Sequence, residues 1–144
     1  MKSFLDRSAG YLINMTALLL KREMTAALSK NKINVTPEQW AILNRLSENS
    51  GLSQKEVARR TFKDNANITR ILDKLEKKGL VKRQMDSNDR RVWKIHITNE
   101  GKTIRDNIEP LAKEILKKAT KGIDSKDVDS FNATAKKMLE NLGQ

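Results

Sequence analysis

The apolar residues of positions 4–30 recur at the three- and four-residue steps of an amphipathic helix. Tyr11, Met15, Leu18 and Leu19 mark one side of this predicted helix. Further apolar residues broaden the stripe beyond one face, and they include Phe4, Leu5, Leu12, Leu20 and Leu28. A helix that is apolar on more than one face usually packs against two surfaces. A second subunit is one candidate for the second surface.

The second predicted helix begins at a group of capping residues. Thr36 suits the N-cap, Pro37 suits the first helical position, and Gln39 is placed to complete a capping box. The tripeptide Asn-Ser-Gly at 49–51 ends this helix.

Two shorter helices follow. Ser53 and the glutamate three residues later form another capping box, which predicts a helix over 53–60. Asp64 caps a helix over 65–78, and the glycine that follows is in the position that ends a helix.

The next segments alternate between apolar and polar residues, which predicts two strands of a hairpin over 80–85 and 92–97. In the second strand, every other residue from Trp93 shares one face. The connection over 86–91 has polar turn residues and is long enough to project.

Two helices complete the chain. Thr98 caps one that extends to about Ala119, Gly122 ends it, and Asp124 caps the last. Phe131 and the apolar residues after it continue at helical spacing. The predicted fold is therefore mainly α with a small β-hairpin. Because a helix-turn-helix pair precedes the hairpin, the centre of the chain is a winged helix-turn-helix.

The helix over 65–78 is the second of the pair, which in this motif enters the major groove with its N-terminal residues leading. The polar face of this helix carries Asn65, Ala66, Asn67, Thr69, Arg70 and Lys74. Asparagine can bind adenine and arginine can bind guanine through two hydrogen bonds. Thr69 suits a phosphate or a thymine methyl group, and Lys74 suits the backbone. The alternative is that these residues only cap and solvate a surface helix.

The loop between the strands contains Asp89, Arg90 and Arg91. An arginine at a hairpin tip can enter a narrow minor groove, where A·T-rich sequence concentrates negative potential. If Asp89 pairs with Arg91 across the turn, Arg90 or Arg91 reaches the DNA. The alternative is a charged turn that water solvates.

Charge supports a polyanionic partner. The chain carries a net charge of +11. Residues 53–98 hold 13 basic and 6 acidic side chains, a net +7 in under a third of the length. This excess favours double-stranded DNA as the partner. A basic protein without such a partner and a protein bound to an anionic membrane are the alternatives, and the second is weak because the basic helices commit their apolar sides to a core.

The composition argues against several other classes of protein. The chain has no cysteine and a single histidine, His96, so thiolate redox chemistry and a zinc site are not expected. We find no catalytic cluster, phosphate-binding glycine loop or nucleophile motif, so we expect no enzyme and no cofactor. No stretch approaches the length of a membrane span, and the N-terminal apolar run lacks a cleavage site, so a cytoplasmic protein is expected.

Several segments together resemble the MarR-type bacterial transcription regulators. TPEQWAIL resembles the start of the family's second helix, and NITRILDKLEKKGLVKR resembles its recognition helix and first wing strand. DSNDRR, followed by VWKIHITNEG, resembles its wing and the entry to its fifth helix. The resemblance is close over 36–102, and the combination of motifs is specific although each alone is not.

The resemblance implies a homodimer that binds a pseudo-palindromic operator and often represses nearby genes. By family pattern, the polar face over 65–70 contacts bases and phosphates, and Arg91, paired with Asp89, is the minor-groove residue. It also implies that 1–34 and 101–144 form a helical dimerisation region around a DNA-binding region over 35–100, the whole being one compact unit.

The family resemblance also raises a small aromatic or anionic effector as a candidate partner. Such a molecule would bind between the dimerisation helices and the DNA-binding region, where Tyr11, Met15 and Trp40 could form an apolar wall. The alternative is that these three are ordinary core residues. The leading hypothesis is a dimeric repressor, and the alternative is an architectural protein that binds DNA without reading sequence.

Overall fold

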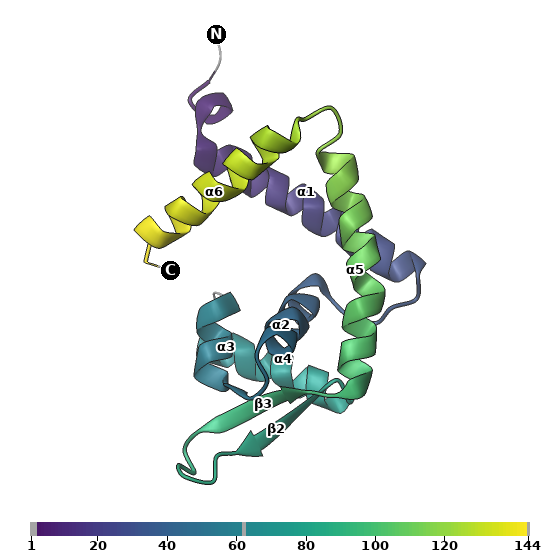
Figure 1. Ribbon diagram of the computed structural model, residues 1–144, viewed down its shortest axis with the longest axis vertical. Coiled ribbons are helices and arrows are strands. Elements are labelled where there is room, and N and C mark those ends of the chain that lie inside the picture. Colours follow the sequence, from purple (N-terminus) through teal and green to yellow (C-terminus); the bar gives the residue numbers. More distant parts are fainter. Residues whose placement is uncertain (1–2, 62, 144) are drawn as a thin grey trace.

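The computed structural model describes residues 3–61 and 63–143, and Figure 1 shows their arrangement. A 3-10 turn, η1, precedes the first helix. The elements in chain order are η1 Leu5–Arg7, α1 Ala9–Lys30, α2 Pro37–Glu48, β1 Leu52–Ser53, α3 Gln54–Thr61, α4 Asn65–Lys77, β2 Val81–Met85, β3 Trp93–Ile97, α5 Asn99–Ala119 and α6 Ser125–Asn141. The expected class, mainly α with a small β-hairpin, is confirmed.

The elements form two groups that α5 joins (Figure 1). Helices α2, α3 and α4 and the sheet lie at the end of the molecule from which the hairpin projects, and α6 lies across α1 at the other end. Helix α5 packs against both α1 and α2. None of the described helices has the length and apolar character needed to cross a membrane.

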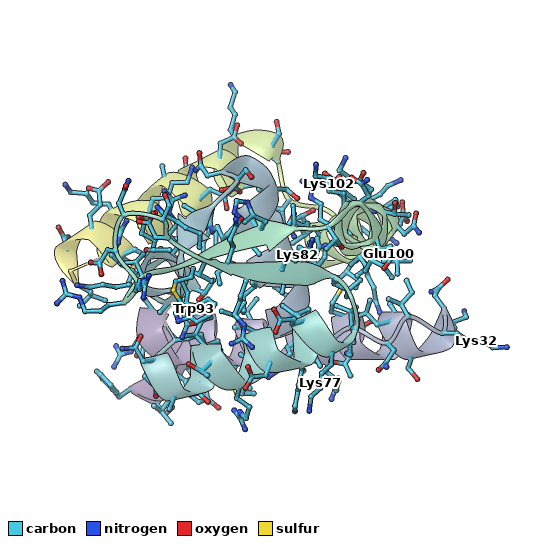
Figure 2. The ribbon with its side chains drawn as sticks, turned by 90° about the horizontal axis from the view of Figure 1, so that it is seen from below. Lys32, Lys77, Lys82, Trp93, Glu100 and Lys102 are labelled. Carbon is cyan, nitrogen blue, oxygen red and sulfur yellow. The ribbon has the colours of Figure 1, made fainter. Side chains whose placement is uncertain are left out.

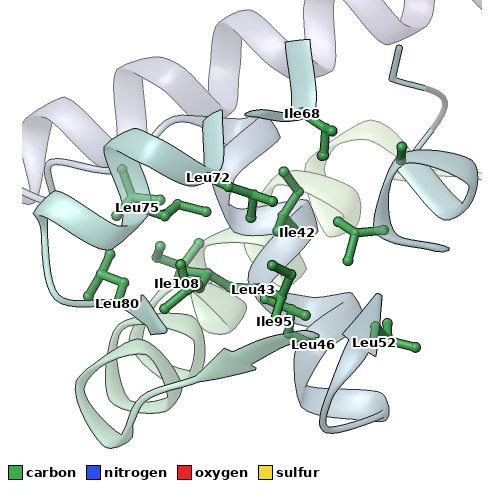
Figure 3. Close-up of a cluster of buried hydrophobic side chains, with 14 of the residues drawn as sticks. Ile42, Leu43, Leu46, Leu52, Ile68, Leu72, Leu75, Leu80, Ile95 and Ile108 are labelled. Carbon is green, nitrogen blue, oxygen red and sulfur yellow. The ribbon is translucent and has the colours of Figure 1, made fainter. Parts of the chain in front are cut away.

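The hydrophobic core sits where α2, α4, α5 and the sheet converge (Figure 3). Its fully buried side chains include Ile42, Leu43, Leu46, Val57, Ile68, Leu72, Leu75, Val81, Ile95 and Ile108. Full burial of one such side chain contributes about 1.5–3 kcal/mol. Because α4 supplies three of these residues, its rotation about its own axis is determined by the core.

The first helix begins later than its apolar pattern predicts. The expected start near residue 4 is wrong, because η1 occupies Leu5–Arg7 and α1 begins at Ala9. Ser8 is extended, and its hydroxyl accepts from the N–H of Tyr11 at 3.4 Å. A serine that caps a helix offers its first turn a partner that apolar spacing does not reveal.

The sheet has three strands where the sequence predicts two. The two-residue strand β1 pairs with β3, so that Leu52 faces Ile95, and the strand order is β1-β3-β2. Such a short strand carries no period of its own, and its pairing joins segments far apart in the chain. The antiparallel pairing of β2 with β3 is as expected.

The predicted caps differ in outcome. The capping box of Thr36 and Gln39 is present, with hydrogen bonds of 3.1 and 3.2 Å. The hydroxyl of Ser53 accepts from the N–H of Glu56 at 3.1 Å. Asp124 occupies the N-cap position of α6 but makes no hydrogen bond there through its side chain.

The start of α5 is pressed against the turn between α4 and β2. The Thr98 hydroxyl donates to the carbonyl of Gly79 at 2.7 Å and accepts from the N–H of Gly101 at 3.0 Å. A Cβ atom on Gly101 would collide with the carbonyl oxygen of Leu80 and lie 2.7 Å from Cγ1 of Ile97. The absence of a side chain at position 101 therefore lets α5 approach the base of the hairpin.

We predict that Gly101→Ala lowers the free energy of unfolding by about 1–3 kcal/mol, because the backbone must move to accommodate the methyl group. Urea denaturation measures the change. Gly10→Ala is the matched control, since a Cβ there meets no atom closer than Oγ of Ser8 at 3.9 Å. Equal stability of the two variants would contradict the close approach.

Candidate nucleic-acid interface

Helix α4 is the candidate recognition helix, and the burial of its apolar stripe determines which residues it exposes. The Asp64 carboxylate accepts from the N–H of Asn67 at 2.8 Å and begins the helix. Ile68, Leu72 and Leu75 are buried. The side chains expected to read DNA lie outside this stripe: Asn65, Ala66, Arg70 and Lys74 are exposed, and Asn67 and Thr69 are half-buried.

Two of the predicted residues are linked on this surface. Nη2 of Arg70 donates to Oδ1 of Asn67 at 2.6 Å, and Nδ2 of Asn67 donates to Oδ2 of Asp64 at 3.3 Å. The chain of bonds restricts the rotamers of both side chains before a partner arrives. It also engages one of the two lone pairs of the amide oxygen that Asn67 would use in a two-bond contact with adenine. Arg70 keeps further N–H donors for a base or phosphate.

Thr69 has a neighbour that sequence patterns did not indicate. Its hydroxyl donates to the carbonyl of Asn65 at 2.8 Å and accepts from Nε2 of Gln54 at 2.7 Å. Because the hydroxyl proton is used inside the helix, the methyl group of Thr69 is the part free to meet a thymine methyl. Gln54 begins α3 and has a second amide N–H. No local motif marks Gln54, because its role depends on how α3 packs against α4.

The wing consists of β2, β3 and the turn over 86–92. Asp89 accepts from the backbone N–H, Nε and Nη2 of Arg91 at 3.0, 3.1 and 3.3 Å. These bonds lower the pKa of Asp89, with the Arg91 side chain the largest cause. The Arg91 side chain is nevertheless 91% exposed, and Arg90 is exposed beside it. The turn therefore presents two guanidinium groups, one of them oriented by a carboxylate.

Arg83 joins the wing to the recognition helix. Its Nη2 donates to Oδ1 of Asp73 at 2.5 Å and to Oε1 of Glu76 at 3.0 Å. Its backbone N–H donates to Oε2 of Glu76 at 3.1 Å. The bond to the Arg83 side chain is the largest cause of the lowered pKa of Glu76, and the bond to Glu76 is the largest cause of the raised pKa of Arg83. This arginine counts toward the basic surplus of the sequence, but its charge is paired within the chain.

Lys78 is a second basic residue whose side chain is bonded within the chain. Its Nζ donates to the carbonyl of Asn34 at 2.7 Å and to Oε1 of Gln39 at 3.0 Å. Burial, and then the nearby charge of Lys74, lowers its pKa. The end of α4 is thereby attached to the turn between α1 and α2.

The three residues expected to wall an effector site lie on two helices, α1 and α2. Tyr11 and Met15 are exposed on α1. Trp40 is half-buried on α2, and its indole N–H donates to the carbonyl of Arg105 on α5 at 3.3 Å. A hollow of about 260 Å³ between α1 and α6 and one of about 250 Å³ between α1 and α5 are lined by other residues. The effector site at these three residues stays a prediction.

The residues at 3–61 and 63–143 contain no group of three or more His, Cys, Asp or Glu side chains arranged to hold a metal ion. His96, the single histidine of the sequence, lies on β3, where its Nδ1 is 3.3 Å from the hydroxyl of Ser50. Its ring covers Gly51, so its observed contacts are structural.

Comparison with known proteins identifies relatives of this arrangement. The model of the MarR family matches residues 35–93. The HTH-type transcriptional regulator FarR of Neisseria gonorrhoeae is 37% identical over 78 residues, which are 54% of this chain and 53% of FarR. The HTH-type transcriptional repressor MdtR of Bacillus subtilis is 32% identical over 70% of this chain and 65% of MdtR. The chain thus spans about half to two thirds of these relatives.

Solved structures share the fold over nearly the whole chain. A MarR-family regulator from Rhodococcus sp. RHA1 has a TM-score of 0.85 and 24% identity, covering 96% of each chain. MepR of S. aureus, solved with DNA, has a TM-score of 0.81 and 23% identity over 93% of this chain and 98% of MepR. CouR from Rhodococcus jostii RHA1, solved with p-coumaroyl-CoA, has a TM-score of 0.84 and 22% identity over 95% of each chain.

We predict that Arg83→Gln lowers the free energy of unfolding by less than about 1 kcal/mol at neutral pH, because Asp73 and Glu76 are 47% and 41% exposed and water screens them. The pKa of Glu76 lies below its ordinary 4.5 in the folded chain. Its contribution is therefore present above that value and is lost as the pH falls through the lowered pKa.

The difference in stability between wild type and Arg83→Gln should accordingly shrink as the pH falls from about 7 to about 3. Urea denaturation across this range measures it. Lys82→Gln removes the same charge from an exposed position of the same strand and serves as the control. A difference for Arg83→Gln that stays constant with pH would contradict the pairing with Glu76.

Proposed function

The chain belongs to the MarR family of transcription regulators, and from this premise we propose that it is a homodimeric repressor that reads a pseudo-palindromic DNA operator. The family has a DNA-binding winged helix, and the chain has that fold. The observation that carries sequence reading is the polar face of α4, where Asn65 and Arg70 are exposed and Arg70 is oriented by Asn67. Side chains of these types distinguish bases in the major groove.

The wing supplies the second part of the proposed contact. Arg91 projects into solvent while Asp89 holds its guanidinium, and Arg90 lies beside it. With α4 in the major groove, a hairpin tip of this charge suits the adjacent minor groove, especially where A·T-rich sequence narrows it. The neighbouring MepR structure contains DNA, which supports DNA as the partner of this fold.

Apolar surface supports the proposed homodimer. The exposed large apolar residues of α1, α5 and α6 are Tyr11, Leu12, Met15, Leu18, Leu19, Leu116, Phe131 and Leu139. So many exposed large apolar side chains on three helices favour a protein partner. We assign 1–34 and 101–144 to dimerisation and 35–100 to DNA binding. Two recognition helices would then lie about one DNA turn, roughly 10 base pairs, apart.

We further propose that a small aromatic or anionic effector releases the protein from DNA. As a regulator that binds the chromosome, the protein would act in the cytoplasm. An effector would act by preferring a dimer in which the spacing of the two α4 helices no longer fits DNA. The neighbouring CouR structure holds p-coumaroyl-CoA, which supports such a ligand. Tyr11, Met15 and Trp40 are the proposed wall of the site.

The second candidate function is that of an architectural protein that uses the same basic surface without reading bases. Arg83 and Lys78 weigh against it, because their charges are engaged within the chain and do not add to the basic surface open to phosphates. An architectural protein would bind all duplexes with similar affinity and a steep dependence on salt.

We predict that Arg70→Ala costs about 1–3 kcal/mol of binding free energy and relaxes specificity at one base pair in each half-site, because its guanidinium contacts a base edge. Fluorescence anisotropy with a set of singly substituted duplexes measures both effects. Lys74→Ala, one helical turn away, is the control and should weaken binding equally for all sequences. A uniform loss for Arg70→Ala would make this arginine a phosphate contact.

We predict that Leu18→Glu converts the dimer into a monomer, because the change puts a charge at an exposed apolar position of α1 that a partner would cover. Analytical ultracentrifugation at several concentrations measures the change. Met85→Glu, at an exposed apolar position of the wing, should leave the dimer intact. Dissociation of both variants, or of neither, would contradict dimerisation through the terminal helices.

A further inference from the structure

The hairpin has an inner face that continues beyond the core. The side chains of this face come in register pairs: Val81 with Ile97, Arg83 with Ile95, and Met85 with Trp93. The first two pairs include the buried Val81 and Ile95, and Arg83, which bonds to Asp73 of α4. The third pair is 44% and 43% exposed and forms what we call the apolar rung, Met85 and Trp93.

Trp93 of the apolar rung lines a hollow between the recognition helix and the wing. This hollow of about 590 Å³ is lined by Gln54, Thr69, Glu76, Arg83 and Trp93. In Figure 2, Trp93 lies toward the free end of the hairpin, and Glu100, in the first turn of α5, lies at the other end. An exposed tryptophan is therefore placed between the two elements that carry the proposed DNA contacts.

The proposed binding mode places one DNA strand next to Trp93. With α4 in the major groove and the wing tip in the adjacent minor groove, the strand that separates the grooves must cross between them. The charges on each side suit a polyanion, since Arg70 lies on α4 and Arg90 and Arg91 lie on the wing tip. Deoxyribose supplies the apolar surface of that strand, and its phosphates accept hydrogen bonds.

The hollow combines two kinds of chemistry. Asp73 and Glu76 accept from Arg83, so two carboxylates share one guanidinium and a phosphate is disfavoured beside it. Gln54 bonds to Thr69 through one N–H and has another to donate. A DNA strand would therefore lie against Trp93 and Gln54, away from the two carboxylates.

We propose that Trp93, supported by Met85, packs against deoxyribose of the DNA strand crossing between α4 and the wing, while Gln54 donates to its phosphate. This inference rests on the proposed DNA-binding function. Tryptophan buries a large apolar area when covered. An apolar contact releases no counterions, so it contributes affinity without changing the salt dependence. Because every nucleotide carries the same sugar, the contribution is independent of sequence.

The test compares Trp93→Ala with wild type on a random-sequence duplex pool and on one A·T-rich duplex, at several salt concentrations. Trp93→Ala should lose about tenfold in affinity on both, a loss of about 1.4 kcal/mol, with the slope of log affinity against log salt unchanged. Trp93→Phe should recover much of the loss. Gln84→Ala, on the outer face of the same hairpin, should bind as wild type does.

A second measurement covers the case in which Trp93→Ala does not fold. In the Trp40→Phe variant, Trp93 is the remaining tryptophan, and its fluorescence should change in intensity and position when the random duplex pool is added. Fluorescence unchanged at saturating DNA would overturn the contact. So would wild-type affinity of Trp93→Ala, or a loss accompanied by a reduced salt slope.

The two proposals fail in different ways. If Arg91→Ala weakens binding and Trp93→Ala does not, the apolar contact is wrong and the DNA-binding function stands. If the wild-type protein binds neither the pool nor the A·T-rich duplex at low salt, the proposed function itself is wrong, and with it the role of Trp93.

Discussion

The burial of one apolar stripe on α4 is the constraint on which the proposed site depends. Ile68, Leu72 and Leu75 are fully buried in the hydrophobic core, and the 3.6-residue period of a helix then determines where the other side chains point. Because these three residues face the core, Arg70 and Lys74 are left exposed to solvent. The surface proposed to read DNA is thus a product of core packing. A change that rotated α4 in the core would move every contact on that surface.

Hydrogen bonds and ion pairs within the chain separate the basic residues that hold the structure together from those available to a partner. Arg83 ties the wing to α4 through Asp73 and Glu76, and Lys78 ties the end of α4 to the turn before α2. Both contribute to the surplus of positive charge in the sequence, and neither is free for phosphate. Arg91 differs, because Asp89 orients it while leaving it in solvent. Net charge identifies the class of partner, and geometry identifies the residues that can meet it.

Features that depend on neighbours in sequence could be predicted, and those that depend on distant contacts could not. The caps at Thr36 and Asp64 were predictable because a side chain and the amides it caps are three residues apart. Strand β1 and the role of Gln54 require partners at Ile95 and Thr69, which no period reveals. The start of α1 was mispredicted because Phe4 and Leu5 continue the apolar pattern through a 3-10 turn. The MarR-type resemblance is confirmed, since its motifs combine several local patterns in a fixed order.

The central claim is that two copies of the chain read DNA sequence together, and selection from a random duplex pool at moderate salt tests it most directly. The account predicts enrichment of a two-fold symmetric motif whose half-sites lie about one turn, roughly 10 base pairs, apart. A motif of this kind requires both a dimer and base readout. Strong, salt-dependent binding to the pool with no enriched motif would contradict the claim and favour an architectural role for the same surface.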